Sequence, residues 1–292
     1  MIAAEEKAAR RVQRRPATRP RIRLRPAALG LNLLTYALAL FIFFPIFWTV
    51  LTGFKTEAEA AAIPPVLLFD ATLDNYRTVF DAGYLDYFEN TVWLAVGSTL
   101  LALALGLPAA YSLAFHPSRR SPTVLSWVLS TKMLPAVGAL IPLIVIYKRV
   151  DLFDTRIGMI LLYAALNLPL VIWMMRSFFA DLPRDIVEAA IVDGAGFLHI
   201  MRRVLLPLTA PGLAATALLS LILSWNEFLL AVNLTGANAG TLPVFISGFQ
   251  TSEGLFWAKM SAASTLAVAP VILAGWLAQR SLVRGLTFGA VK

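Results

Sequence analysis

Residues 188–207 read E-A-A-I-V-D-G-A-G-F-L-H-I-M-R-R-V-L-L-P and separate two long apolar runs. Just upstream, Asp181 can cap a helix whose acidic residues lie near its positive end, and this helix is expected to run to about Asp193. Gly194 supplies the backbone freedom for a sharp turn. A second, amphipathic helix is expected after the turn, because apolar residues recur at helical spacing on one face: Phe197, Ile200, Met201, Val204 and Leu205.

The composition places the rest of the chain in lipid. Of 292 residues, 59% are hydrophobic and only 14% are charged, with a mean hydropathy of +0.73. A membrane-spanning helix needs roughly 20 mostly apolar residues. The sequence therefore predicts an all-α membrane protein with six transmembrane helices, at about Leu29–Gly53, Thr91–Phe115, Thr123–Tyr147, Ile157–Met175, Thr209–Leu230 and Met260–Gln279.

The distribution of basic residues predicts the orientation, because Lys and Arg are biased toward the cytoplasmic side. Eighteen of the twenty-five lie in the N-terminal segment, the second and fourth loops and the C-terminal tail. Residues 55–89 carry seven acids against two bases, which suits an outer loop long enough to form a small packed cap. Both termini, and the 181–207 loop between the fourth and fifth spans, are therefore expected in the cytoplasm.

Three regions follow from this pattern. Residues 1–27 form a basic, Pro-rich arm that is expected to be disordered, 28–280 form the transmembrane domain, and 281–292 form a cytoplasmic tail. The net charge of +8 does not indicate nucleic acid binding, because nine bases lie in the arm, where topology and attraction to anionic lipid explain them. The paired arginines of the arm resemble an export signal, but the apolar run that follows is too long for a cleavable one.

Lys132 and Glu227 are the two charged side chains expected inside spans, where each costs about 2.5 to 3.5 kcal/mol near the centre. Lys132 lies about 9 residues into its span and Glu227 about 18, so straight helices separate them in depth by roughly 13 Å at 1.5 Å per residue. A direct ion pair is not expected unless a kink intervenes. Prolines 135, 142 and 169 fall inside spans and are expected to kink them.

The stretch from Glu188 to Pro207 fits the pattern E-A-A-x3-G-x9-I-x-L-P, with valine in place of isoleucine. It thereby resembles the cytoplasmic loop by which permease subunits of ABC importers engage their ATPase. The matching residues are Glu188, Ala189, Ala190, Gly194, Val204, Leu206 and Pro207. With Ser224–Phe228, Thr241–Val244 and Gly285–Lys292, they make residues 28–292 similar to the second, maltose-type permease of carbohydrate importers. The stretch Ser252–Lys259 further resembles mannitol and sorbitol permeases.

The resemblance implies a bacterial inner-membrane subunit that pairs with a homologous permease and sits on two ATPase subunits. An extracytoplasmic binding protein would deliver a sugar or sugar alcohol. The chain is expected to bind no cofactor and to catalyse no reaction, while the partner ATPase hydrolyses ATP with Mg. The sequence agrees, because it contains no G-x-x-x-x-G-K-[ST] loop. In this family the loop helix moves with the closing ATPase and switches the permeases between inward-facing and outward-facing states.

Several residues keep two interpretations. Trp225, Asn226 and Glu227 can line the translocation path, since an aromatic face and an amide suit a sugar, or they can brace the outer gate or the partner. Lys132 can face a water-filled cavity, or it can donate hydrogen bonds to backbone carbonyl groups that Pro135 leaves without a helical partner. The small residues Ala102, Gly106 and Ala110 indicate close helix packing, within the chain or at a subunit interface.

Rival functions need features that are weak in this sequence. An ion-coupled secondary transporter or channel would require buried coupling charges, of which the spans hold two isolated ones. A membrane-embedded enzyme would require paired carboxylates, a histidine cluster or an activated nucleophile. His116 and His199 have no carboxylates at ligand spacing, so no metal site is expected. The alternative for the loop itself is an amphipathic helix resting on the membrane surface.

Overall fold

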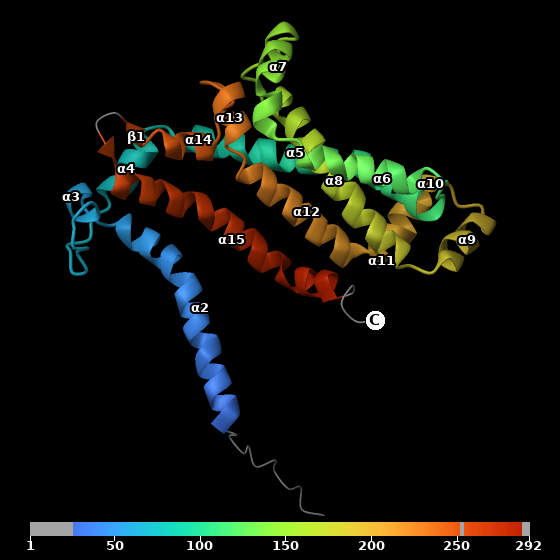
Figure 1. Ribbon diagram of the computed structural model, residues 1–292, viewed down its shortest axis with the longest axis horizontal. Helices are drawn as coiled ribbons and strands as arrows, with labels where there is room; N and C mark the ends of the chain where they lie inside the picture. The colour runs from blue at the N-terminus through green and yellow to red at the C-terminus, as the bar shows by residue number, and fades with distance from the viewer. Residues whose placement is uncertain (1–25, 252–253, 288–292) are drawn as a thin grey trace, which may run out of the picture. The chain divides into compact units, whose positions relative to one another are not determined.

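The computed structural model describes residues 26–251 and 254–287, with side chains described from residue 30 to 279 in those ranges. The predicted arm before residue 26 and the end of the predicted tail lie outside the described residues. The described chain is almost entirely helical, as its composition predicts (Figure 1). Its long helices are α2 (Pro26–Thr52), α5 (Tyr84–Phe115), α8 (Arg156–Ala180) and α15 (Trp257–Thr287).

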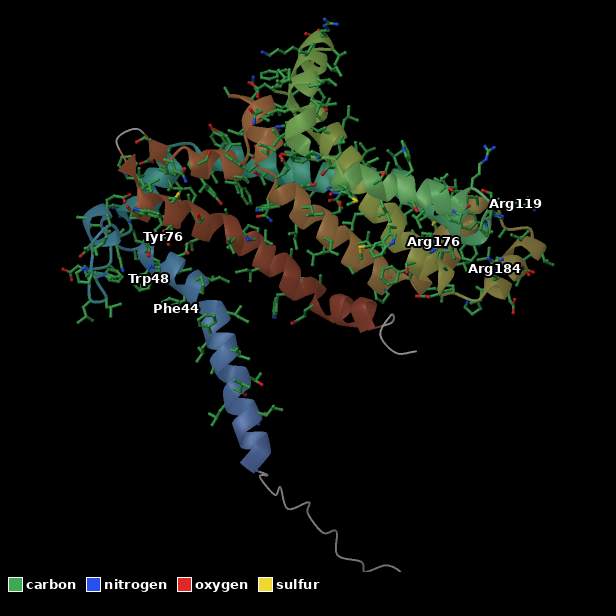
Figure 2. The ribbon with its side chains drawn as sticks, in the orientation of Figure 1. Phe44, Trp48, Tyr76, Arg119, Arg176 and Arg184 are labelled. Atoms are coloured by element: carbon green, nitrogen blue, oxygen red, sulfur yellow. The ribbon has the colours of Figure 1, made fainter. Side chains whose placement is uncertain are left out.

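The chain divides into two units, residues 1–48 and 49–292. Helix α2 makes up the described part of the first unit and enters the second at its last turn. Its segment Gly30–Thr52 is 23 residues long and apolar enough to cross a membrane. Phe44 and Trp48 lie one turn apart on this helix and stack, with ring centroids separated by 5.9 Å (Figure 2).

The second unit is a helical bundle in which α5 packs along α8, and α12 (Ala210–Trp225) contacts α5, α8 and α15 (Figure 1). Small residues allow the close approach of α5 and α8. A Cβ atom on Gly106 would lie only 2.6 Å from Val171 Cγ1, and Ala102 and Ala110 are fully buried. The stripe of small residues therefore packs within the chain, which is the simpler of its two predicted interpretations.

The third predicted span is a bent pair of helices rather than one rod. Helix α6 (Ser121–Ser130) continues into the 3-10 turn η1 (Thr131–Met133), which meets α7 (Ala136–Arg149) at 87°. Pro135 precedes α7 at its N-cap, where the missing N–H of proline removes no helical hydrogen bond. The expected kink is thus a complete break of the helix axis.

The fifth predicted span also differs. Helix α12 ends at Trp225, so its predicted continuation to Leu230 is wrong: residues 226–228 form a break before α13 (Leu229–Leu234). At its other end, α12 makes an angle of 89° with the helical segment Phe197–Leu208. By length and composition, four described helices can cross a membrane, or up to six if each bent pair is one span. The number six stays a prediction.

Short elements form a packed cap at the end of the bundle opposite α9 (Arg184–Val192), as the 55–89 stretch predicts (Figure 1). The buried Lys55 ammonium donates a 2.7 Å hydrogen bond to the Val66 carbonyl. The Glu57 carboxylate accepts the first N–H groups of α15, at 3.0 Å each from Ala258 and Lys259. The cap comprises α3 (Glu57–Ala60), α4 (Asp74–Asp81), α14 (Leu242–Ser247) and the antiparallel strands β1 (Gln250–Thr251) and β2 (Gly254–Leu255).

Candidate functional site

The loop 181–207 forms the predicted helix, glycine turn and second helix. Helix α9 spans Arg184–Val192 and ends in a Schellman motif, in which Ala195 N–H donates to the Ala190 carbonyl (3.0 Å) and Gly194 N–H to the Ile191 carbonyl (2.9 Å). Gly194 adopts a φ of +80°, a conformation that residues with a side chain rarely take. The glycine is therefore required by the turn that reverses the chain after α9.

The start of α9 differs from the prediction. Asp181 was expected to cap this helix, but it is the C-cap residue of α8, and α9 has Pro183 at its N-cap without a side-chain cap bond. The reason is that α8 continues to Ala180, so that only three residues connect the two helices. A proline at the N-cap keeps this short connection extended.

Buried apolar side chains fix the loop to the bundle. Val187 on α9 is 3% exposed and belongs to the same core cluster as Met175 and Phe179 of α8. Beyond the turn, α10 (Phe197–His199), the π-helical segment η2 (Ile200–Leu205) and α11 (Leu206–Leu208) follow. Leu205 is fully buried in this cluster. Because the loop shares the core of α5 and α8, it can transmit a displacement to those helices as one body.

The exposed surface of α9 carries small and apolar side chains together with two acids, Asp185 and Glu188. Glu188 and Ala189 are exposed, and Val192 is 85% exposed. A hollow of about 420 Å³ lies at the end of α9 and the glycine turn, and its lining includes Ala190, Gly194 and Val204. Of the remaining motif residues, Pro207 is exposed and Leu206 is half-buried. The motif thus brings together an exposed helix, a turn and a hollow, which is a surface suited to holding a partner protein.

A half-open cavity of about 230 Å³ lies beside the break in the third span, and it is called the polar cavity here because most of its lining residues have polar side chains. Lys132 in η1 and Glu227 after α12 both line it, although straight helices would place them far apart in depth. No salt bridge joins the two among the described residues. The two residues are not directly paired, as predicted, and the separation expected for straight helices does not apply, because the break at Pro135 intervenes.

Glu227 has a structural role that its sequence position does not reveal. Its carboxylate accepts hydrogen bonds from the N–H groups of Leu230 and Ala231, at 3.0 Å each, and from the Tyr163 hydroxyl at 3.1 Å. The two N–H groups belong to the first turn of α13, where a negative charge is favoured. Glu227 therefore starts α13 and ties it to α8.

Trp225 and Asn226, expected beside Glu227, line a different cavity. This second cavity has about 470 Å³ and lies between the end of α12, α14 and α15. Trp225 is 7% exposed and packs edge-on against Phe88, while Asn226 donates a local hydrogen bond to the Ile222 carbonyl. The four residues predicted for the path thus divide into two pairs on separate cavities.

Two further polar residues of α8, which no sequence motif marks, complete the lining of the polar cavity. Asn167 of α8 is 3% exposed and donates a 2.8 Å hydrogen bond to Ser224 Oγ, which lies 2.9 Å from Ser98 Oγ of α5. Tyr163 and Asn167 both line the cavity. An amide inside an apolar run was the available signal for Asn167, because buried polar groups in lipid need partners.

Comparison with known proteins gives consistent matches. The model of a family described as binding-protein-dependent transport system inner membrane component matches residues 102–287. The chain is 36% identical to a protein of Sinorhizobium fredii named as a probable ABC transporter permease protein, over 87% of this chain and 92% of that protein. It is 34% identical to a trehalose transport system permease protein of Mycobacterium tuberculosis, over 85% and 92% of the two chains.

A solved structure confirms the fold. The chain matches one from a bacterial ABC transporter involved in the import of the acidic polysaccharide alginate, with a TM-score of 0.72 and 23% sequence identity. The match covers 87% of this chain and 96% of that chain. The overall fold of the chain is therefore one already seen in a solved structure.

Proposed function

Because the chain belongs to the family of binding-protein-dependent transport system inner membrane components, we propose that it is the permease subunit of an ATP-driven importer for a sugar or sugar alcohol. It pairs with a homologous permease, binds two ATPase subunits and receives substrate from an extracytoplasmic binding protein. The relative named as a trehalose transport system permease protein supports a carbohydrate as the substrate class. The polyol branch rests only on the resemblance of Ser252–Lys259, of which residues 252 and 253 lie outside the described ranges.

The observation that carries the coupling proposal is the construction of α9. Val187 anchors one face of the helix in the core of α5 and α8, while Glu188 and Ala189 on the other face are exposed. Small side chains can enter a groove of the ATPase at little steric cost, and Glu188 adds one charge that the groove can recognise. Closure of the ATPase moves α9, and its anchored face moves the bundle with it.

The polar cavity lies on the helices that this movement displaces. Asn167 and Tyr163 come from α8, while Ser224 and Glu227 come from the end of α12. Amide, hydroxyl, carboxylate and ammonium groups together offer hydrogen bonds to several hydroxyl groups of a carbohydrate. This cavity is therefore the part of the translocation path that the chain contributes, and Lys132 and Glu227 are its charged members.

The end of the second unit that carries α9 faces the cytoplasm. The Arg residues at 119, 176 and 184 gather at this end (Figure 2), in agreement with the bias of basic residues toward the cytoplasm. The cap formed by α3, α4 and α14 then faces outward, where the binding protein delivers its substrate. By the same bias of basic residues, the N-terminal arm and the C-terminal tail are both cytoplasmic.

The proposal is tested with the complex in membrane vesicles that are loaded with ATP and supplied with the binding protein. We expect uptake to require internal ATP and to persist when ionophores abolish ion gradients. Gly194→Val should abolish uptake without preventing membrane insertion, because a β-branched residue at a φ of +80° costs about 1 to 3 kcal/mol and distorts the turn. Glu188→Lys should do the same by reversing the charge.

A matched control is available two residues away. Gly196 has a φ of −75° and a ψ of 165°, and a Cβ atom placed there would meet nothing within 4 Å. Gly196→Ala should therefore keep uptake near the parent rate. Uptake that follows an ion gradient and continues after ATP depletion would instead favour a secondary transporter. The substrate is identified by calorimetry on the binding protein with mannitol, sorbitol, maltose and trehalose.

A further inference from the structure

A third cavity lies where α5 and α8 end, next to the start of α9. It has about 110 Å³, and two arginines line it: Arg176 in the last turns of α8 and Arg184, the first residue of α9. The short loop after α5 contributes Pro117 to the lining, and Arg119 follows two residues later. Figure 2 shows Arg119, Arg176 and Arg184 at the same end of the bundle.

These arginines have no partner within the described part of the chain. No hydrogen bond or ion pair joins Arg119, Arg176 or Arg184 to a described residue, although Arg176 is half-buried. Much of the remaining lining is apolar and includes Leu113 and the fully buried Phe179. A guanidinium in such a place is stabilised by an anion, and its planar fork matches a phosphate group particularly well.

The surface beside the cavity is apolar and suits lipid chains. Trp173 lies three residues before Arg176 on the same face of α8 and is 48% exposed. Helix α6 packs against α8, and its Val124 and Trp127 are 44% and 68% exposed. Tryptophan is enriched where the hydrocarbon of a membrane meets its headgroups. The cavity thus has charge at the bundle end and apolar side chains toward the bundle centre.

We propose that this arginine cavity binds the phosphate of an anionic phospholipid, whose acyl chains lie along α6 and α8. This proposal rests on the proposed function in one respect: it takes the α9 end of the bundle to lie at the cytoplasmic surface of the membrane. The anionic lipids of that leaflet attract basic residues. A phosphate between Arg176 and Arg184 would link the end of α8 to the start of α9. The lipid would therefore hold the coupling helix in place on the bundle.

The test is native mass spectrometry of the intact complex after incubation with mixed micelles of phosphatidylglycerol and phosphatidylcholine. The parent complex should retain phosphatidylglycerol in preference to phosphatidylcholine. The double variant Arg176→Gln, Arg184→Gln should bind phosphatidylglycerol about tenfold more weakly than the parent. This change corresponds to about 1.4 kcal/mol of binding free energy. Arg202→Gln, Arg203→Gln removes the same charge from two exposed residues that do not line the cavity, and it should retain the lipid.

Three results would overturn the proposal. Equal retention by the two double variants would mean that the cavity plays no part. Displacement of the lipid by inorganic phosphate at millimolar concentration would identify a soluble anion as the ligand. Loss of the ATPase subunits from the Arg176→Gln, Arg184→Gln complex would assign the arginines to the protein interface. Lipid retention is measured without turnover, so its outcome is independent of whether the complex imports a sugar.

Discussion

The Tyr163 hydroxyl of α8 donates a 3.1 Å hydrogen bond to Glu227 Oε2 at the break between α12 and α13. The same carboxylate accepts two N–H groups of the first turn of α13. Tyr163 is 1% exposed and Glu227 is half-buried, so the tyrosine side of this contact is shielded from water. One acidic side chain thus holds together three helical segments around the polar cavity.

Replacement of Glu227 should therefore destabilise the protein in a graded way. Glu227→Ala leaves the Tyr163 hydroxyl and two N–H groups without an acceptor, at about 1 to 3 kcal/mol for each buried group left unpaired. Glu227→Gln keeps one carbonyl oxygen and should cost less. Tyr163→Phe removes one donor and leaves no other donor without an acceptor, so it should lower the stability least. Thermal unfolding in detergent measures the order, and equal shifts for all three variants would refute the capping role.

Gly106→Ala should loosen the packing of α5 on α8. The added Cβ atom would meet Val171 Cγ1 at 2.6 Å, and Val171 is fully buried, so one of the helices must shift. Overpacking of this kind costs about 1 to 3 kcal/mol. Gly138→Ala in α7 is the control, because no atom lies within 4 Å of its Cβ position. Similar unfolding temperatures for the two variants would contradict the close contact.

Asp154 should give the cap end of the bundle an acid-dependent stability. Burial acts to raise the pKa of its carboxyl, but hydrogen bonds from the backbone N–H groups of Gly236, Ala239 and Asn238 outweigh it and hold the pKa below its usual range. A carboxyl whose pKa is lower in the folded state stabilises the fold at pH values above its unfolded pKa of about 3.9. This stabilisation is lost as the pH falls from there through the folded-state pKa.

The corresponding variant is Asp154→Asn. Its unfolding temperature should lie below that of the parent at neutral pH, and the difference should shrink as the pH falls below about 4. Unfolding scans at several pH values measure this. A difference that is independent of pH would show that the Asp154 charge does not hold the 236–239 loop.

The absence of cysteine from the chain allows a direct test of orientation. Ala61 at the cap end and Ser118 at the α9 end are both exposed. A membrane-impermeant maleimide applied to intact cells should label Ala61→Cys, and should label Ser118→Cys only after the membrane is opened. The reverse pattern would invert the proposed topology.

The sequence predicted the segments of the fold better than their bends. Apolar length located the long apolar helices, and the loop motif located the helix, turn and helix of 181–207, because burial and a glycine with positive φ have strong local signals. The break at Pro135 could be expected only as a kink, since its angle depends on packing between α6, α7 and α8. The placement of Lys132 depended on that angle.

The polar cavity was predicted less well for the same reason. Glu227 was recognised as costly in lipid, but its bonds to Tyr163 and α13 depend on a helix end that apolar composition conceals. Asn167 carries no pattern beyond being an amide in a span. Asp181 was misassigned because α8 extends past the apolar run that suggested its end.

Cross-linking from α9 tests the central claim that this helix docks on the ATPase most directly. In the otherwise cysteine-free chain, Ala189→Cys places a thiol on the exposed face of α9, and Ala61→Cys places one on the exposed cap. A bifunctional thiol- and amine-reactive reagent applied to the complex in opened membranes should join position 189, and not position 61, to the ATPase subunit. Cross-linking from position 61, or none from position 189 while the complex remains assembled, would contradict the account.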